Sequence, residues 1–361
     1  MSLATSVSSA WIIGVGLIGG SIGKALRQNE WTVYGTDLDN DALTKALSVG
    51  AIDKVGPYPE CDVVFVCVPS SSSVEVIKKA LTQAPEAIVS DVAGVKESIC
   101  SEVVDPRFIG GHPMAGSEKL GVSGSDSQIF EGRAWVLTPN ETTDPAIFAK
   151  LHGIVTLLGA RPIAMSPKRH DILVATVSHL PHLLAASLMN LAGDQAEEFA
   201  ELLLLAAGGF RDMTRISSSD PQGWPDICIE NKQAIGVAID AIVERLAQVN
   251  KAVANEDREA ILSTLISARQ RREMLPAKGD VPLRIAQISV RIQDRPGALA
   301  QITTKAAQMG INIEDLAIAH ALGGGAGTLY LSVDESKASD FMGQLQAEDF
   351  HAMLVTSTDR V

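Results

Sequence analysis

The chain has 361 residues, a formal net charge of -13, 46% apolar residues and 20% charged residues. Its length exceeds what one hydrophobic core usually organises, so two or three domains are expected. The acidic surplus opposes binding to nucleic acid or to an anionic membrane, because both need a basic face. No unbroken apolar run approaches the ~20 residues of a membrane span. The four cysteines lie far apart without metal-site spacing, which favours a reducing cytoplasm.

The first third of the chain alternates short β-branched runs with helical patterns. A helix is predicted at residues 20–28, and strands are predicted at residues 11–15, 32–36, 63–68, 87–91 and 134–138. Strands separated by amphipathic helices are typical of right-handed βαβ units and of a largely parallel sheet. Residues 1–165 are therefore predicted to form a doubly wound, Rossmann-type α/β domain.

The next stretch, residues 166–276, shows long helical periods and no strand pattern. Helices are predicted at residues 171–191, 196–207, 224–249 and 256–272. Several of them carry apolar residues around most of their circumference, which predicts burial on more than one side. We therefore expect an all-helical substrate and dimerisation domain that forms a homodimer.

A polar linker is predicted at residues 277–282, and a third pattern follows it over residues 283–361. Strands are predicted at residues 283–292, 313–319, 328–333 and 351–356, with helices at residues 297–309 and 336–347. This βαββαβ order is that of a ferredoxin-like domain.

A glycine-rich turn follows the first predicted strand and matches the pattern G-x-G-x-x-G. The pattern is weak alone, but here a helix follows it and Asp37 ends the second strand, near the usual offset of about 20 residues. Asp37 can accept hydrogen bonds from both ribose hydroxyls and would repel the 2′-phosphate of NADP, so NAD is the predicted cofactor. The competing interpretations are a site for a flavin or another adenosine-containing ligand, and a glycine turn that binds nothing. The predicted cofactor-binding residues are Gly14, Gly16, Leu17, Ile18, Gly19, Asp37, Val68 and Pro69.

Three later motifs carry side chains suited to catalysis. In GGHPMAGSE, His112 lies between glycines and a proline, and its neutral imidazole can take a proton from a hydroxyl group as hydride leaves. In SHLPH, His179 and His182 share a helical face; a zinc site would need a further ligand that no helical spacing supplies. In GGFRDMTRI, the guanidinium groups of Arg211 and Arg215 suit carboxylate recognition. The alternatives are an ordinary loop histidine for His112, an interface pair for His179 and His182, and a solvated helical face for Arg211 and Arg215.

Together these motifs resemble the prephenate and arogenate dehydrogenase family over roughly residues 10–275. The resemblance implies NAD-dependent oxidative decarboxylation of prephenate to 4-hydroxyphenylpyruvate in tyrosine biosynthesis, with arogenate as the alternative substrate. It implies that His112 is the catalytic base and that Arg215 binds the ring carboxylate. The substrate-pocket residues that it implies are Ser117, Glu118, Ser178, His179, His182, Arg211 and Trp224.

One position departs from this family pattern. Gly94, in DVAGVK, stands where many relatives carry a serine that helps to orient the catalytic histidine. Ser90, a water molecule or the cofactor would then have to take over that role.

The tail resembles an ACT domain, an amino-acid-sensing module, through the segments DRPGAL and GINI. The resemblance implies feedback inhibition by tyrosine, whose carboxylate would be captured by backbone N–H groups of the strand-to-helix turn. The predicted effector-binding residues are Asp294, Gly297, Ala298, Asn312 and Ile313. Two rival functions are a β-hydroxyacid dehydrogenase, a class that usually needs a catalytic lysine, and a non-enzymatic sensor of NAD and amino acids.

Overall fold

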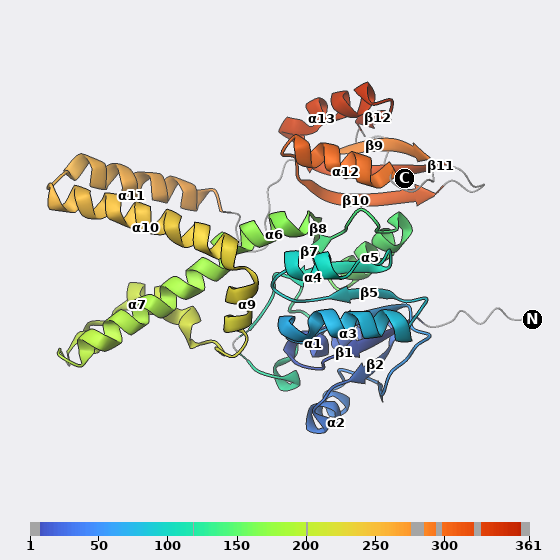
Figure 1. The fold of residues 1–361 in the computed structure, drawn as a ribbon, viewed down its shortest axis with the longest axis horizontal. Coiled ribbons are helices and arrows are strands. Elements are labelled where there is room, and N and C mark those ends of the chain that lie inside the picture. The colour runs from blue at the N-terminus through green and yellow to red at the C-terminus, as the bar shows by residue number, and fades with distance from the viewer. Residues whose placement is uncertain are drawn as a thin grey trace, which may run out of the picture. The chain divides into compact units, whose positions relative to one another are not determined.

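The computed structural model describes residues 8–117, 119–199, 201–275, 285–293, 298–320 and 326–354. The chain divides into two compact units, one formed by Met1–His170 with Pro282–Val361 and the other by Asp171–Val281. The ribbon is shown in Figure 1. The second unit covers nearly the same stretch as the predicted helical domain.

The first unit begins with a parallel sheet in the strand order β3-β2-β1-β4-β5-β6, which is the Rossmann order. Its strands are β1 (Ser9–Ile13), β2 (Thr32–Thr36), β3 (Lys54–Val55), β4 (Val63–Val66), β5 (Ile88–Asp91) and β6 (Phe108–Pro113). Two more strands extend it, β7 (Ala134–Thr138) antiparallel to β6 and β8 (Arg161–Ala164) parallel to β7. The predicted Rossmann-like sheet is confirmed, although β3, β8 and most of β6 were not predicted. Glycine and proline are poor strand formers, which explains why the GGHP segment of β6 gave little strand signal.

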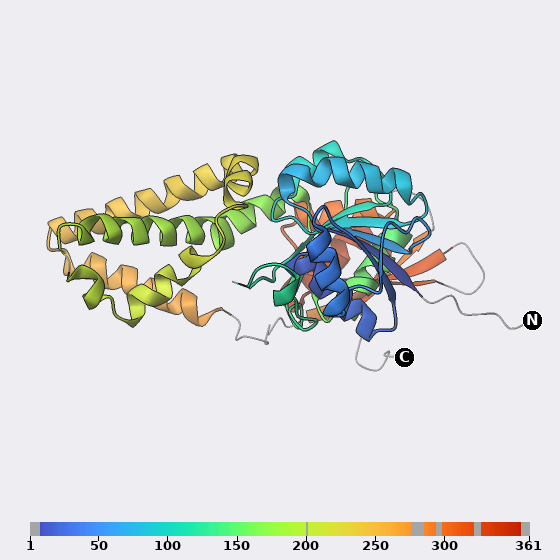
Figure 2. The same ribbon diagram turned by 90° about the horizontal axis from the view of Figure 1, so that it is seen from below.

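Helices cover both faces of this sheet, and Figure 2 shows α1 and α3 on opposite sides of it. The helices are α1 (Leu17–Gln28), α2 (Asn40–Ser48), α3 (Ser70–Gln83), α4 (Glu97–Glu102) and α5 (Pro145–Leu157). All residues of β4 and β5 are buried, as expected for strands covered on both faces. Trp135 of β7 packs against Phe65 and Phe130, with ring centroids 6.2 and 5.1 Å apart. The sheet is thus a well-packed support for the loops at its carboxyl edge.

The C-terminal part of the first unit is a small antiparallel sheet with two helices. Its elements are β9 (Ile285–Gln293), α12 (Ala298–Gln308), β10 (Ile313–His320), β11 (Ala326–Asp334), α13 (Glu335–Ala347) and β12 (His351–Leu354). The strand order is β12-β9-β11-β10, and Ile313 of β10 pairs with Ala164 of β8. Val290, Leu331 and Phe341 are fully buried in its core. The small sheet suggests a ferredoxin-like arrangement.

The second unit is helical. Its helices are α6 (Pro167–Val174), which begins in the first unit, α7 (Leu180–Ala196), α8 (Gly208–Thr214), α9 (Trp224–Glu230), α10 (Lys232–Ala254) and α11 (Arg258–Glu273). Helix α10 packs against α7 and α11. The helix predicted at residues 196–207 is wrong, because α7 ends at Ala196 and only a short 3-10 turn follows, at Leu202–Leu205. Leu204 and Leu205 are exposed there, so no buried face stabilises a longer helix.

One continuous helical segment, Pro167–Ala196, is long and apolar enough to cross a membrane by length and composition, with a mean hydropathy of 1.6. Only 28% of its most apolar window is buried. The segment contains no long unbroken apolar run, because histidines and other polar residues interrupt it. An apolar helical surface of this kind also suits contact with another protein subunit.

Candidate active site

The glycine turn between β1 and α1 has the geometry of a dinucleotide site. Gly14 has φ +94°, and a Cβ atom there would clash with the carbonyl of Cys67 after β4. A Cβ atom on Gly19 would clash with the carbonyl of Gly14. At Gly16, in contrast, a Cβ atom would meet nothing within 4 Å. Packing therefore explains the first and third glycines, whereas the second opens onto free space, where the cofactor pyrophosphate would approach the backbone.

Leu17 and Ile18 form the first turn of α1, and no side chain caps the start of that helix. Its N–H groups are thus available for an anion, as in other helix N-termini that bind phosphate. Asp37, at the end of β2, accepts hydrogen bonds from the backbone N–H groups of Val15 at 2.8 Å and Asp39 at 3.0 Å. These bonds orient the carboxylate and leave it further acceptor capacity for ribose hydroxyls. The residues present fit NAD.

Val68 and Pro69 follow β4, the neighbour of β1 at the point where the strand order reverses. Ligands of such sheets bind outside the carboxyl ends of the strands at this point. Burial raises the pKa of the adjacent Cys67 thiol and raises the pKa of Cys61 to about 11. Both thiols therefore stay protonated at neutral pH and are poor nucleophiles.

His112 lies on β6, opposite Val136 of β7, and is half-buried. Its Nδ1 atom lies 2.8 Å from Nε2 of His170, and the two rings meet edge to face with centroids 5.0 Å apart. His170, on α6, is completely buried. If Nδ1 of His112 donates the shared proton, its Nε2 atom is left as a hydrogen-bond acceptor, which is the form that a general base requires.

A buried ion pair supports the strand that carries His112. Lys96 and Asp91 are both completely buried and pair through Nζ and Oδ2. The other carboxylate oxygen of Asp91 accepts the backbone N–H of Gly111 at 3.1 Å. A Cβ atom on Gly111 would lie 2.8 Å from Oγ of Ser90 and 2.6 Å from the carbonyl of Asp91. This close packing and the buried charges position the backbone immediately before His112.

These contacts bear on the missing serine at Gly94. The hydroxyl of Ser90 lies beneath Gly111 and contacts the carbonyl of Asp91 at 3.4 Å. His170, which was not among the predicted site residues, is a side chain that contacts the His112 ring. The sequence offered one signal for it: a histidine followed by an acidic residue, Asp171, at the junction of two predicted domains.

In the second unit, a cluster of aromatic side chains brings together three of the predicted residues. Trp224 stacks on His182 with ring centroids 3.6 Å apart and meets His179 edge to face at 6.1 Å. His179 is buried, and its Nδ1 atom lies 3.2 Å from Nδ2 of Asn231. The same Asn231 amide donates to the carbonyl of Asp171 at 2.9 Å. Asn231, a further residue that sequence reasoning missed, thus ties α10 to the start of this helical unit.

The His179 side chain comes from a π-helical turn at Ala175–His179, a feature that is frequent at functional sites. Ser178 lies in the same turn and is half-buried. Desolvation lowers the pKa of His182, so its imidazole is neutral at neutral pH and can donate or accept a hydrogen bond.

The two predicted arginines are exposed and do not lie on one regular helix. Arg211 is in α8 and its Nε atom donates to the carbonyl of Ala206 at 3.1 Å, whereas Arg215 opens a 3-10 turn. Ser117 is exposed and accepts the backbone N–H of Lys119, while Glu118 lies outside the described residues. Over the part of the chain that the structure describes, no three His, Cys, Asp or Glu residues are grouped as metal ligands.

Of the predicted effector residues, Asn312 and Ile313 lie at the start of β10 and face a cavity together with part of α12. Asp294 and Gly297 lie outside the described residues, as does the side chain of Ala298.

Comparisons with known proteins agree with this arrangement. Residues 22–164 match the nucleotide-binding domain of prephenate dehydrogenase, and residues 166–267 match the prephenate dehydrogenase dimerization domain. A prephenate dehydrogenase from Bacillus subtilis is 31% identical over 323 residues, which are 85% of this chain and 87% of that protein.

Two solved structures are also similar. Prephenate dehydrogenase from A. aeolicus, in complex with hydroxyphenyl propionate and NAD+, has a TM-score of 0.70 and 31% identity, over 75% of this chain and 99% of that one. Synechocystis arogenate dehydrogenase has a TM-score of 0.65 and 28% identity, over 73% of this chain and 99% of that one. The predicted NAD-dependent oxidoreductase is confirmed, and the chain belongs to the prephenate dehydrogenase family.

Proposed function

We propose that this chain converts prephenate and NAD+ to 4-hydroxyphenylpyruvate, carbon dioxide and NADH. The observation that carries the proposal concerns His112. It lies on the sheet that also bears the dinucleotide turn, and its Nδ1 atom lies 2.8 Å from Nε2 of the buried His170 on α6. Bound NAD+ supplies the hydride acceptor. The backbone at Gly16 and the first turn of α1 would hold its pyrophosphate, and Asp37 would bind its ribose.

His112 acts as the general base in this proposal. Its Nε2 atom accepts the proton of the ring hydroxyl while hydride leaves the ring carbon that bears this hydroxyl. Nε2 of His170 accepts a hydrogen bond from the Nδ1–H group of His112 throughout, so His170 orients the neutral imidazole and stabilises the imidazolium that forms. This gives His170 the positioning role of the serine that is missing at Gly94. The ion pair of Asp91 and Lys96 keeps the strand in place for that geometry.

Arg215 binds the ring carboxylate that departs as carbon dioxide, and formation of the aromatic ring drives the reaction forward. An exposed guanidinium in a chain of net charge -13 gives a local attraction for an anionic substrate. The remaining substrate contacts that we propose are Ser117, Glu118, Ser178, His179, His182, Arg211 and Trp224. The stacked pair of Trp224 and His182 offers a flat apolar surface to a ring-shaped substrate.

The substrate is tested by adding NAD+ and prephenate and following the absorbance of NADH. Arogenate is the second candidate, because the similar Synechocystis structure is an arogenate dehydrogenase. The two substrates differ only by a keto or an amino group on the side chain, so kcat/KM for each decides between them. A chain that reduces NAD+ with neither substrate contradicts the proposal.

We further propose a homodimer formed through the helical unit, in the cytoplasm. Helix α10 exposes an apolar face made of Ile239, Val243, Leu246 and Val253, which would be unfavourable in water without a partner. The related family domain is described as a dimerization domain. Light scattering that gives the mass of a monomer at micromolar concentration would contradict the dimer.

We also propose that the C-terminal part is a ferredoxin-like ACT domain that responds to tyrosine. The strand order β12-β9-β11-β10 and the element order βαββαβ support the fold. If neither the activity nor the melting temperature changes with tyrosine or phenylalanine, this part has only a structural role.

A further inference from the structure

Asn231 stands at the start of α10 but does not cap that helix. It directly precedes Lys232, at the position where an asparagine side chain usually accepts a backbone N–H of the first turn. In the part of the chain that the structure describes, the Asn231 side chain makes no such bond, and the residue is only 5% exposed. Its Nδ2 atom instead donates to the carbonyl of Asp171 at 2.9 Å and lies 3.2 Å from Nδ1 of His179. The amide is thus used to hold two other segments of the helical unit.

The two contacts of Asn231 determine which nitrogen of His179 carries the proton. A backbone carbonyl can only accept, so the amide group that faces Asp171 is the NH2 group and not the oxygen. The second hydrogen of this group is available to Nδ1 of His179. Because two donors cannot share a hydrogen bond, Nδ1 is unprotonated and the neutral ring carries its proton on Nε2. An imidazolium does not fit this contact, since both of its nitrogens are donors.

Apolar packing fixes the surroundings of His179. The histidine ends the π-helical turn and is 1% exposed. A buried cluster joins this turn and the start of α7 to α10, and it consists of Ala175, Leu180, Ile235 and Ala238. Ile235 lies one helical turn after Asn231, so the cluster and the amide hold the same end of α10. Because His179 and Asn231 are both buried, water does not readily replace a hydrogen bond that is lost between them.

His179 in turn contacts the proposed ring-binding surface. Its ring meets Trp224 edge to face, with centroids 6.1 Å apart and an interplanar angle of 88°, which is a favourable arrangement of aromatic rings. Trp224 stacks on His182 with an interplanar angle of 10°. Trp224 is also the first residue of α9, and Asn231 directly follows the last one. The indole is therefore held in two ways, through the ring of His179 and through the backbone of α9.

We propose that Asn231 is a positioning residue for the substrate-binding surface. Its amide keeps His179 neutral and protonated on Nε2, and this ring holds Trp224 flat against His182. The stacked pair is then formed before the substrate arrives. Preorganisation of this kind lowers the free-energy cost of binding, so it acts on substrate affinity more than on the chemical step. The positioning role rests on the proposed function, whereas the protonation state of His179 does not.

NMR spectroscopy of the full-length protein labelled with 15N-histidine tests the protonation state without any assay of activity. The 15N shifts of the two ring nitrogens differ between the two neutral tautomers and the imidazolium. We expect the pattern of the Nε2–H tautomer for His179 at neutral pH, and the loss of this signal in His179→Gln identifies it. The pattern of an Nδ1–H tautomer or of an imidazolium would overturn the proposal.

Two variants test whether the amide is responsible. Asn231→Asp keeps the shape of the side chain and a good N-cap residue but replaces the NH2 group by an acceptor, so His179 should gain a proton on Nδ1. Asn231→Leu removes the donor without adding a charge. Asn255→Asp makes the same charge change at the exposed C-terminal end of α10 and is the matched control, which should leave the His179 signal unchanged. An Nε2–H pattern that persists in Asn231→Asp would overturn the proposal.

Kinetics and affinity test the positioning role. Asn231→Leu should raise KM for prephenate by about tenfold and leave kcat within about threefold of the parent, because His112 is untouched. Calorimetry with NAD+ present should show a similar loss of affinity for 3-(4-hydroxyphenyl)propionate. Asn231→Ser, which keeps an N-cap side chain, takes the place of the leucine variant if that variant does not fold. The positioning role is overturned by an unchanged KM and affinity, by a kcat that falls as far as KM rises, or by an equal loss in Asn255→Asp.

These measurements separate the positioning role from the proposed function. A chain in which His179 is the Nε2–H tautomer, but which reduces NAD+ with neither prephenate nor arogenate, would contradict the proposed function and leave the His179 assignment intact. A chain that oxidises prephenate while His179 carries its proton on Nδ1 would overturn the role of Asn231 and leave the proposed function intact.

Discussion

The two histidine sites of this protein are held in different ways. His112 sits on a strand, beside a buried histidine and a buried ion pair, so hydrogen bonds and charges define its geometry. His182 sits on a helix and is held by the face of Trp224. Proton transfer needs a fixed geometry, whereas a ring-binding surface tolerates adjustment. We therefore propose that the strand site carries the chemistry and that the helical site contacts the substrate.

The largest effect is expected when the base is removed. His112→Asn should lower kcat by at least about 100-fold, because general base catalysis is lost. NAD binding, measured by fluorescence titration, should not change, because the glycine turn is untouched. A near-normal kcat would remove the distinction between the two sites.

The next effect tests whether the buried neighbour positions His112. His170→Phe removes the hydrogen-bond partner and should lower kcat by up to about 100-fold with little change in KM. His170→Gln keeps an amide oxygen that can accept a hydrogen bond from the Nδ1–H group of His112, so it should recover part of kcat. Equal losses in both variants, accompanied by a lower melting temperature, would mean that His170 only fills space.

Removal of the proposed carboxylate ligand should act on binding. Arg215→Gln should raise KM for prephenate by about tenfold or more, because a charge-assisted hydrogen bond is lost. Arg245→Gln, in the exposed middle of α10, is the matched control and should leave KM unchanged. An unchanged KM in Arg215→Gln contradicts the carboxylate role.

The smallest effect concerns the pH dependence of stability at the helical site. Desolvation lowers the pKa of His182 below its ordinary value of 6.5 in the folded state, so the unfolded chain binds the proton more readily. This contribution to the free energy of unfolding is complete above pH 6.5 and is lost as the pH falls toward the folded-state pKa. Urea titrations between pH 5 and 8 give the free energies of unfolding of the parent and of His182→Gln. The two values should converge at the acid end of this range. Parallel curves would show that His182 does not titrate differently in the two states.

Local spacing in the sequence determined a large part of this protein. The glycine turn, Asp37 at the end of β2, the alternation of strands and helices and the His112 motif all depend on residues that are close in the chain. Their conformational requirements, such as positive φ at Gly14, apply within a few residues. Such patterns were sufficient to predict the Rossmann-like sheet, the cofactor and the family.

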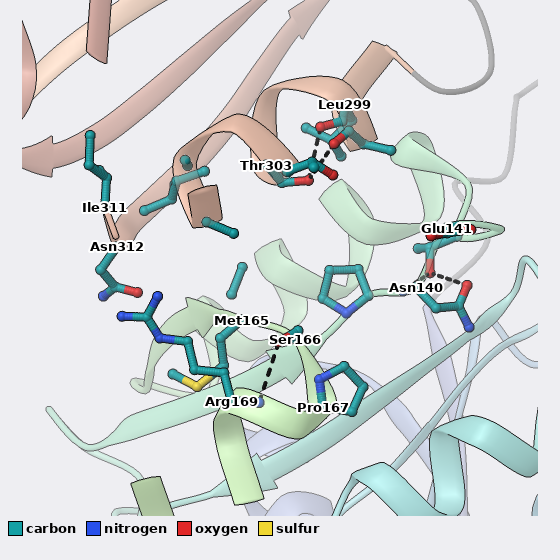
Figure 3. Close-up of a pocket in the computed structure, with 18 of the residues that line it drawn as sticks. Asn140, Glu141, Met165, Ser166, Pro167, Arg169, Leu299, Thr303, Ile311 and Asn312 are labelled. Atoms are coloured by element: carbon teal, nitrogen blue, oxygen red, sulfur yellow. Dashed lines mark hydrogen bonds between the residues drawn. The ribbon is translucent and has the colours of Figure 1, made fainter. Parts of the chain in front are cut away.

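The tertiary structure alone decided which distant side chains meet. His170 contacts His112 across 58 positions of sequence, and Asn231 contacts His179 across 52. Arg169 and residues of α12 line the same cavity (Figure 3) because the C-terminal part packs beside β8. Such contacts depend on how separate elements pack, and a single sequence carries no local periodicity that reports them. For the same reason, the leucines at 202–205 looked like a helix but have no buried face to stabilise one.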